Sequence, residues 1–271
     1  QVQVVDMRHE LRAGNRSMFS RALHRELEDV LQYEQQAILF LNRRGNATYV
    51  FCRDCGHTME CVRCGIPLTF HSTLNRLICH HCNVRRSAVE RCPQCGSGRI
   101  RHFGVGTEAV QAEVERCFPT ARTLRWDWDV TRQRGAHEQI LRRFCDREAD
   151  VLIGTQMIAK GLDLPMVTLV GAISCDVGLS LPDYRAAERT FQVLTQVAGR
   201  AGRGLLGGRA LLQTYMPEHH AIRAAASHDY AAFYRHEIQL REQHGYPPFG
   251  KLARLIGRDR SLARVRADAE Q

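Results

Sequence analysis

Eight cysteine residues carry the clearest chemistry in this sequence. They form four Cys-x-x-Cys pairs between residues 52 and 95: Cys52/Cys55, Cys61/Cys64, Cys79/Cys82 and Cys92/Cys95. Such a turn lets two thiolates bind one ion, and two turns complete the tetrahedral cage of a structural zinc site. A closed cage leaves no position for water, so the sequence predicts two zinc ions with a structural rather than a catalytic role.

The spacing of the pairs indicates which of them share an ion. Fourteen residues separate Cys64 from Cys79, close to the spacing of zinc ribbons, whereas only five separate Cys55 from Cys61. We therefore predict nested sites, although pairing of neighbouring turns stays open. The outer site takes Cys52, Cys55, Cys92 and Cys95, and the inner site takes Cys61, Cys64, Cys79 and Cys82.

Other uses of the thiols fit the sequence less well. No signal peptide is visible, so we do not expect disulfides. A redox-sensing role stays as an alternative, which tight zinc binding without thiol reactivity would exclude. The remaining cysteines, Cys117, Cys145 and Cys175, are expected to be small core residues of a reducing compartment.

Three further stretches carry residues that suit phosphate or nucleic acid. Thr155 follows an apolar run and opens a polar loop through residue 165, typical of phosphate and sugar contacts at the end of a strand. In residues 196–203 (QVAGRAGR), Arg200 and Arg203 lie three apart on one predicted helical face, where they could stabilise a transferring phosphoryl group. Residues 42–45 (NRRG) follow another apolar run. An ordinary βα loop and a solvated helix end are the alternatives for the first two stretches.

Length and composition are those of a soluble protein. The chain has 271 residues and a formal net charge of +9, with 44% hydrophobic residues. It is long enough for one large or two modest domains. No apolar run approaches the length of a membrane span and no targeting segment is visible, so we expect a cytoplasmic protein.

Strand and helix patterns alternate along the chain. Ser20 is predicted to cap a helix with Leu23, Leu27 and Val30 on its apolar face, and Thr107 a second helix. A long helix is predicted to open at residues 182–183, and two more cover residues 136–144 and 230–238. Predicted strands are residues 2–5, 37–41, 121–126, 150–154, 166–172 and 209–214. This alternation predicts an α/β fold with a parallel sheet flanked by helices, interrupted by the cysteine-rich segment.

Two glycine-rich stretches fit nucleotide-binding patterns without their context. Residues 245–252 (GYPPFGKL) match most of a phosphate-binding loop, but Pro247 and Pro248 lack amide donors and Leu252 cannot bind Mg²⁺. Residues 202–207 (GRGLLG) lie between a predicted helix and a predicted strand, the reverse of the dinucleotide-binding order. We therefore reject both as nucleotide sites.

The joint order of motifs resembles the family of primosomal protein N′ (PriA), the bacterial replication-restart DNA helicases. The resemblance runs from Val4 to about Ile256 and rests on LNRRG, the four cysteine pairs, FGVGTE, GTQMIAKGLDLP, LPDYRAAER and QVAGRAGR. LNRRG looks like helicase motif IV, GTQMIAKGLDLP like motif V and QVAGRAGR like motif VI of superfamily 2. The resemblance implies a RecA-like second helicase lobe with an inserted two-zinc ribbon module.

The resemblance also implies domain boundaries. Residues 1–51 would form the first part of the lobe, 52–103 the zinc-binding insertion and 104–228 the rest of the lobe. Residues 229–271 would form a helix and the truncated start of an α+β C-terminal domain.

Site residues and partners follow from the same resemblance. Gln196, Arg200 and Arg203 would face the phosphates of ATP bound by a first lobe that this chain lacks, with Asp163 near the nucleotide. Arg43, Thr155 and Gln156 would lie near the backbone of single-stranded DNA. The full-length enzyme would use ATP and Mg²⁺ beside two structural Zn²⁺. Implied partners are branched replication forks and DNA single strands, other primosome proteins and single-stranded DNA-binding protein, in the bacterial cytoplasm at the nucleoid.

Beside the redox-sensing alternative, the resemblance leaves two functions to compare. The first is part of an ATP-dependent 3′-to-5′ DNA helicase that restarts stalled forks and initiates primosome assembly. Because the chain has no usable Walker A or Walker B motif, we expect it to be inactive by itself. The alternative is a zinc-ribbon DNA- or protein-docking module without ATPase function.

Overall fold

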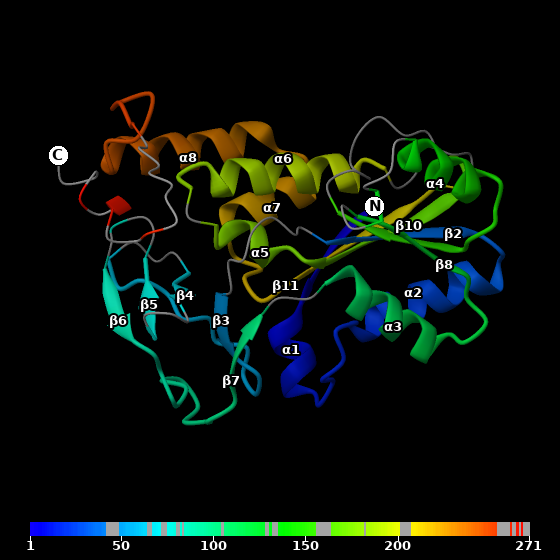
Figure 1. Ribbon diagram of the computed structural model, residues 1–271, viewed down its shortest axis with the longest axis horizontal. Helices are drawn as coiled ribbons and strands as arrows, with labels where there is room; N and C mark the ends of the chain where they lie inside the picture. Colours follow the sequence, from blue (N-terminus) through cyan, green and yellow to red (C-terminus); the bar gives the residue numbers. More distant parts are fainter. Residues whose placement is uncertain are drawn as a thin grey trace. The chain divides into compact units, whose positions relative to one another are not determined.

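The computed structural model divides into two units, Gln1–Phe233 and Tyr234–Gln271 (Figure 1). It describes residues 1–41, 49–63, 67–71, 75–79, 82, 84–103, 106–127, 130–131, 135–155, 164–181, 183–200, 207–253, 261, 264–265 and 267. None of the helices in this part of the chain combines the length and the apolar character that a membrane span requires.

A six-stranded parallel sheet forms the centre of the first unit. Its order is β1-β11-β10-β2-β9-β8, and every neighbouring pair is parallel. All residues of β2 are buried, as expected for a central strand covered on both faces. The strands are β1 (Val2–Asp6), β2 (Gln36–Leu41), β8 (Thr123–Trp126), β9 (Val151–Gly154), β10 (Val167–Ser174) and β11 (Arg209–Thr214).

Helices cover both faces of this sheet, which confirms the predicted α/β fold (Figure 1). Alternate residues of β2 enter two separate cores, Ile38 and Phe40 on one face and Leu39 and Leu41 on the other. On the second face lie α1 (Met7–Arg12), α2 (Arg21–Gln32) and α3 (Thr107–Cys117); on the first lie α4 (Ala136–Cys145), α6 (Ala186–Ala198) and α7 (His220–Ser227).

Helix α2 packs closely on the sheet. Ser20 is its N-cap, and the Ser20 hydroxyl accepts a hydrogen bond of 3.1 Å from the backbone N–H of Leu23, as predicted. Leu23 and Leu27 are fully buried beneath the helix. A Cβ atom at Gly171 of β10 would lie 2.8 Å from Leu23 Cδ1, so any larger residue there would have to displace the Leu23 side chain.

A second, antiparallel sheet is built from the cysteine-rich segment between β2 and α3. Its order is β6-β5-β4-β3-β7. Val50, Leu68 and Leu77 belong to its own small core, together with two of the cysteines. We call this segment, residues 49–103, the zinc module. Its strands are β3 (Tyr49–Cys52), β4 (Thr69–His71), β5 (Arg76–Ile78), β6 (Arg85–Ser87) and β7 (Ile100–Phe103).

Two helix starts differ from the prediction. Thr107 is the first residue of α3 rather than its cap, because its hydroxyl donates instead to Asp127 Oδ2 at 2.5 Å. Helix α6 begins at Ala186, not at Asp183. The Asp183 carboxylate precedes the helix and accepts hydrogen bonds from the Arg185 N–H and from the Arg189 side chain of α6. At Thr107 the side chain expected to cap a helix therefore has another partner.

Three short or polar helices were not predicted from the sequence: α1, α7 and the single turn α5 (Asp176–Leu179). Helix α8 (Tyr230–Gln243) begins in the first unit and continues into the second. Residues 254–260, part of the expected start of a C-terminal domain, lie outside the described residues. The domain boundaries stay a prediction.

Candidate zinc sites and motor-lobe residues

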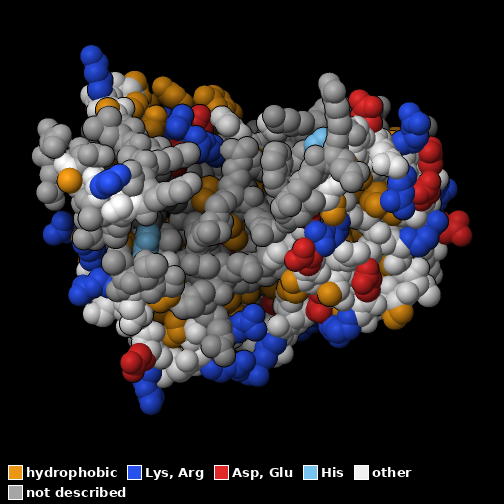
Figure 2. All heavy atoms as spheres, viewed as in Figure 1, with side chains coloured by type: hydrophobic (Ala, Val, Ile, Leu, Met, Phe, Trp, Pro, Cys, Tyr) orange, Lys and Arg blue, Asp and Glu red, His pale blue; other side chains and the backbone are white. Residues whose placement is uncertain are grey.

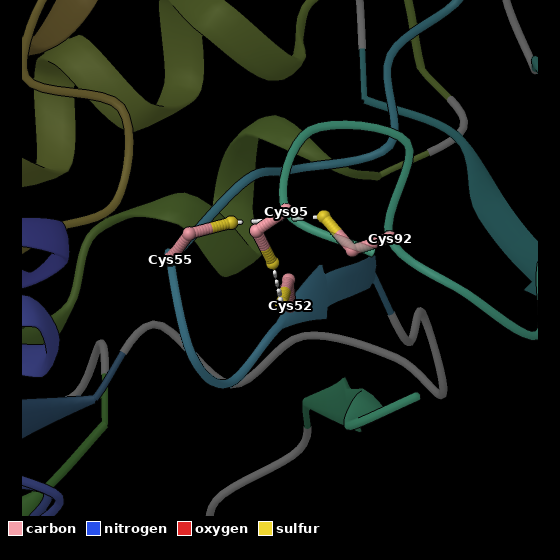
Figure 3. Close-up of side chains that lie close together, drawn as sticks. All are labelled: Cys52, Cys55, Cys92 and Cys95. Carbon is pink, nitrogen blue, oxygen red and sulfur yellow. Dashed lines mark hydrogen bonds between the residues drawn. The ribbon is translucent and has the colours of Figure 1, made fainter. Parts of the chain in front are cut away.

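Four cysteines converge at the end of β3 in the zinc module (Figure 3). The sulfur atoms of Cys52, Cys55, Cys92 and Cys95 all lie within 4.8 Å of one another. Cys52 and Cys95 sulfurs are 3.5 Å apart, and those of Cys55 and Cys92 are 3.6 Å apart. A tetrahedron with Zn–S bonds of about 2.3 Å has edges of about 3.8 Å. These separations are far too long for disulfides and fit a Cys₄ zinc cage.

The local backbone explains why these turns direct two thiols at one point. The N–H of Cys52 donates to the His57 carbonyl at 2.9 Å, and the N–H of Gly56 donates to the Cys52 carbonyl at 2.8 Å. Gly56 has φ +75°, a conformation that favours glycine. The turn at Cys92 repeats both bonds, to Ser97 and from Gly96. The Cys-x-x-Cys-Gly pattern therefore specifies the turn as well as its ligands.

A second cluster is formed by Cys61, Cys79 and Cys82. Their sulfurs also lie within 4.8 Å of one another, and those of Cys61 and Cys82 are 3.4 Å apart. Cys64, the fourth predicted ligand, lies outside the described residues. The two clusters fit two structural zinc ions. The individual ligand assignments stay predictions, and the nested pairing is the one this geometry supports.

Three of the seven predicted motor residues, Thr155, Gln196 and Arg200, belong to the described part of the chain. Thr155 follows β9 directly, is partly buried, and donates its N–H to the Trp126 carbonyl at 3.4 Å. Gln196 is exposed on the last turn of α6. Arg200 is partly buried and lies two residues beyond the end of α6 at Ala198. Arg43, Gln156, Asp163 and Arg203 lie outside the described residues.

A buried carboxylate beside Thr155 was not singled out from the sequence. Asp127 follows β8 and is 2% exposed. It accepts hydrogen bonds from the Thr107 hydroxyl at 2.5 Å, from Arg125 Nε at 3.1 Å and from the Val130 N–H at 3.2 Å. Burial raises the pKa of Asp127, but Thr107, Val130 and Arg125 together lower it below its ordinary value. An ionised Asp127 thus joins Thr107, Arg125 and Val130 through hydrogen bonds. The signal in the sequence was the position of Asp127 directly after a strand.

Charge is unevenly distributed over the molecule. Residues 52–103 contain eight arginines and three acidic residues. Figure 2 shows mostly basic side chains on the side of the antiparallel sheet, whereas both signs are mixed on the side of α2–α4. A basic surface of this kind favours contact with phosphate groups.

Comparison with known proteins finds matches for the zinc module and for the lobe. Residues 61–86 match the PriA DNA helicase Cys-rich region (CRR) domain, and residues 128–204 match the Helicase conserved C-terminal domain. The Replication restart protein PriA of Bacillus subtilis (strain 168) is 48% identical over 271 residues, which are 100% of this chain and 34% of that protein. The protein of the same name from Synechocystis is 48% identical over 258 residues, 94% of this chain and 31% of that protein.

Among solved structures, the Mss116p DEAD-box helicase domain 2 bound to an RNA duplex is 13% identical, with a TM-score of 0.41 over 83% of this chain and 57% of that chain. A likeness at that level carries no argument about function.

The parallel sheet and the match over residues 128–204 define the class of protein: a RecA-like C-terminal helicase lobe, here with an inserted zinc ribbon. The cysteine-rich match and the identity along the whole chain specify it further. The chain belongs to the PriA family of replication restart proteins. It spans about a third of the length of the curated relatives it matches.

Proposed function

We propose that this chain supplies the second motor lobe and the zinc module of an ATP-dependent 3′-to-5′ DNA helicase that restarts stalled replication forks. The observation that carries the proposal is the continuous identity of 48% with a replication restart protein over both the lobe and the zinc module. Zinc contributes folding free energy to the module and takes no part in the chemistry.

In this proposal the lobe completes an ATP site whose phosphate-binding loop belongs to a first lobe. Arg200 and Arg203 stabilise charge on the transferring phosphoryl group, Gln196 assists them, and Asp163 lies near the nucleotide. Support comes from the helicase match, which includes all four residues, and from the absence of a usable phosphate-binding loop in the sequence.

DNA is the proposed substrate of the motor. Thr155, at the carboxyl end of β9, is where ligands approach a parallel sheet, and Arg43 and Gln156 follow the ends of β2 and β9 in sequence. These three residues are proposed to contact the backbone of a single strand, and the basic zinc module to contact branched DNA. Other primosome proteins and single-stranded DNA-binding protein are proposed partners, which would place the protein at the nucleoid.

A chimera tests the proposal. This chain would replace the corresponding third of the Bacillus subtilis relative, and DNA-stimulated ATP hydrolysis would be measured. We expect an active chimera in which Arg200→Ala or Arg203→Ala lowers turnover by about 10³-fold, the scale of an arginine finger. Arg142→Ala, an exposed arginine of α4, is the matched control and should have no effect.

The alternative function gives a different result in the same assay. A docking module without ATPase function would complete no ATP site, so the chimera would not hydrolyse ATP and the two arginine variants would have no turnover to lower. The purified chain would still bind forked DNA or a protein partner.

A further inference from the structure

Two strands of the zinc module make contacts around the short helix α5 of the lobe. Strand β4 contacts α5 directly, and β3 contacts Tyr215, a residue whose N–H binds α5. Helix α5 is one turn long, and a helix of that length is not stable by itself. It lies between β10 and α6, the helix that leads to Arg200. Its position therefore depends on what holds its two ends.

The first end of α5 is anchored on the parallel sheet. Asp176 is fully buried, and its carboxylate accepts a hydrogen bond of 2.5 Å from the Thr214 hydroxyl at the end of β11. The backbone N–H of Tyr215 donates to the same carboxylate, at 3.2 Å from Oδ1 and 3.1 Å from Oδ2. Asp176 thus ties α5 to the end of β11.

The zinc module contacts this anchor through β3. The rings of Phe51 and Tyr215 are 4.5 Å apart between centroids, and Phe51 is 1% exposed. Phe51 belongs to a core of the lobe, whereas its neighbour Val50 belongs to the core of the module. Because adjacent side chains of a strand point to opposite faces, β3 joins the two bodies directly before the zinc ligand Cys52.

The second end of α5 is held by β4. The Thr69 hydroxyl donates to the Ser180 carbonyl at 3.1 Å, and both residues are buried, at 5% and 3% exposed. Ser180 is the C-cap of α5, and its own hydroxyl donates to the Asp176 carbonyl at 3.2 Å. The zinc module therefore supports both ends of this helical turn, one directly through Thr69 and the other through the packing of Phe51 on Tyr215.

From these contacts we propose that the zinc module is a positioning element of the motor, with Thr69 and Phe51 holding α5 and thereby the start of α6. Loss of either contact loosens α5 while both zinc ions stay bound. The consequence for ATP turnover rests on the proposed function; the structural part does not.

The test is hydrogen exchange of the zinc-loaded chain. Thr69→Val removes the donor and keeps the shape, and we expect amide exchange in residues 176–186 to become about fivefold faster, the change that follows from loss of one buried hydrogen bond. Thr69→Ser retains the hydroxyl and should exchange like the parent chain. Thr58→Val is the matched control, because Thr58 is a buried threonine of the same module whose hydroxyl has no hydrogen-bond partner among the described residues.

Phe51→Leu provides a second variant, and elemental analysis confirms two zinc ions in each. Unchanged exchange of residues 176–186 in both Thr69→Val and Phe51→Leu would overturn the proposal. In the chimera, Thr69→Val should lower kcat severalfold without changing DNA affinity. If Arg200→Ala and Thr69→Val both leave kcat unchanged while exchange still rises, the proposed function fails and the positioning contact stands.

Discussion

Replacing Asp176 by asparagine should remove a pH dependence from the stability of this protein. Asp176 is fully buried at the start of α5. Burial raises the pKa of its carboxyl group from 3.8 to about 6, although hydrogen bonds from Thr214 and the Tyr215 N–H oppose this by favouring the ionised form. The protonated carboxyl is therefore favoured by the folded chain.

The direction in which stability changes with pH follows from the protonation states of Asp176 in the folded and the unfolded chain. Between pH 3.8 and about 6 the unfolded chain releases the proton while the folded chain retains it, so stability falls as the pH rises through this range. A difference of about two pKa units corresponds to roughly 3 kcal/mol, all of it lost above pH 6. The side-chain amide introduced by Asp176→Asn would stay neutral, accept from the Tyr215 N–H and donate to the Thr214 hydroxyl, so the variant should lack this loss.

Urea unfolding of the zinc-loaded chain at several pH values is the assay. From about pH 5 to pH 8, in buffer with excess zinc, the stability of Asp176→Asn relative to the parent should rise by about 1 kcal/mol. Asp150→Asn is a control of opposite sign, because burial raises the Asp150 pKa but Arg122 lowers it below its ordinary value overall. At neutral pH the Asp150→Asn variant should therefore be less stable than the parent chain. A difference between Asp176→Asn and the parent that does not change with pH would refute the reasoning.

Three more predictions follow from the fold and the site. Elemental analysis should find two zinc ions per chain, and a single zinc would contradict the two cages. Chelation should unfold the zinc module, because zinc supplies roughly 10 kcal/mol or more of folding free energy in small modules. Circular dichroism should then show that the parallel sheet and its long helices are retained, while α5 loses the contacts of Phe51 and Thr69. Gly171→Ala should destabilise the chain by about 1–3 kcal/mol in urea unfolding, because its Cβ would lie 2.8 Å from Leu23 Cδ1. Gly98→Ala, with its nearest atom at 3.9 Å, should be nearly neutral. The isolated chain should show no DNA-stimulated ATP hydrolysis, and hydrolysis abolished by Lys251→Ala would show that residues 245–252 bind nucleotide after all.

Local signals in the sequence were sufficient for most of the parallel sheet. Residues 37–41 form a continuous apolar run because β2 is buried on both faces, and Ser20 precedes an apolar stripe because α2 covers one face of the sheet. Helix starts were less predictable. Thr107 and Asp183 have the side chains of caps, but Asp127 and Arg189 compete for them, and the Thr107 partner comes from another element.

The cysteine pattern by itself predicted four metal-binding turns from the Cys-x-x-Cys spacing, and the glycines after Cys55 and Cys95 favour the local backbone conformation of two of them. Which turns meet depends on the antiparallel pairing of β3 with β7, which brings Cys52 beside the turn at Cys92. Only the tertiary structure decided that Phe51 enters the core of the lobe and that Thr69 reaches Ser180, 111 residues away. These contacts arise where the zinc module packs against the helicase lobe. The hydrophobic periodicity of a single strand or helix does not encode which residues of another element it will meet.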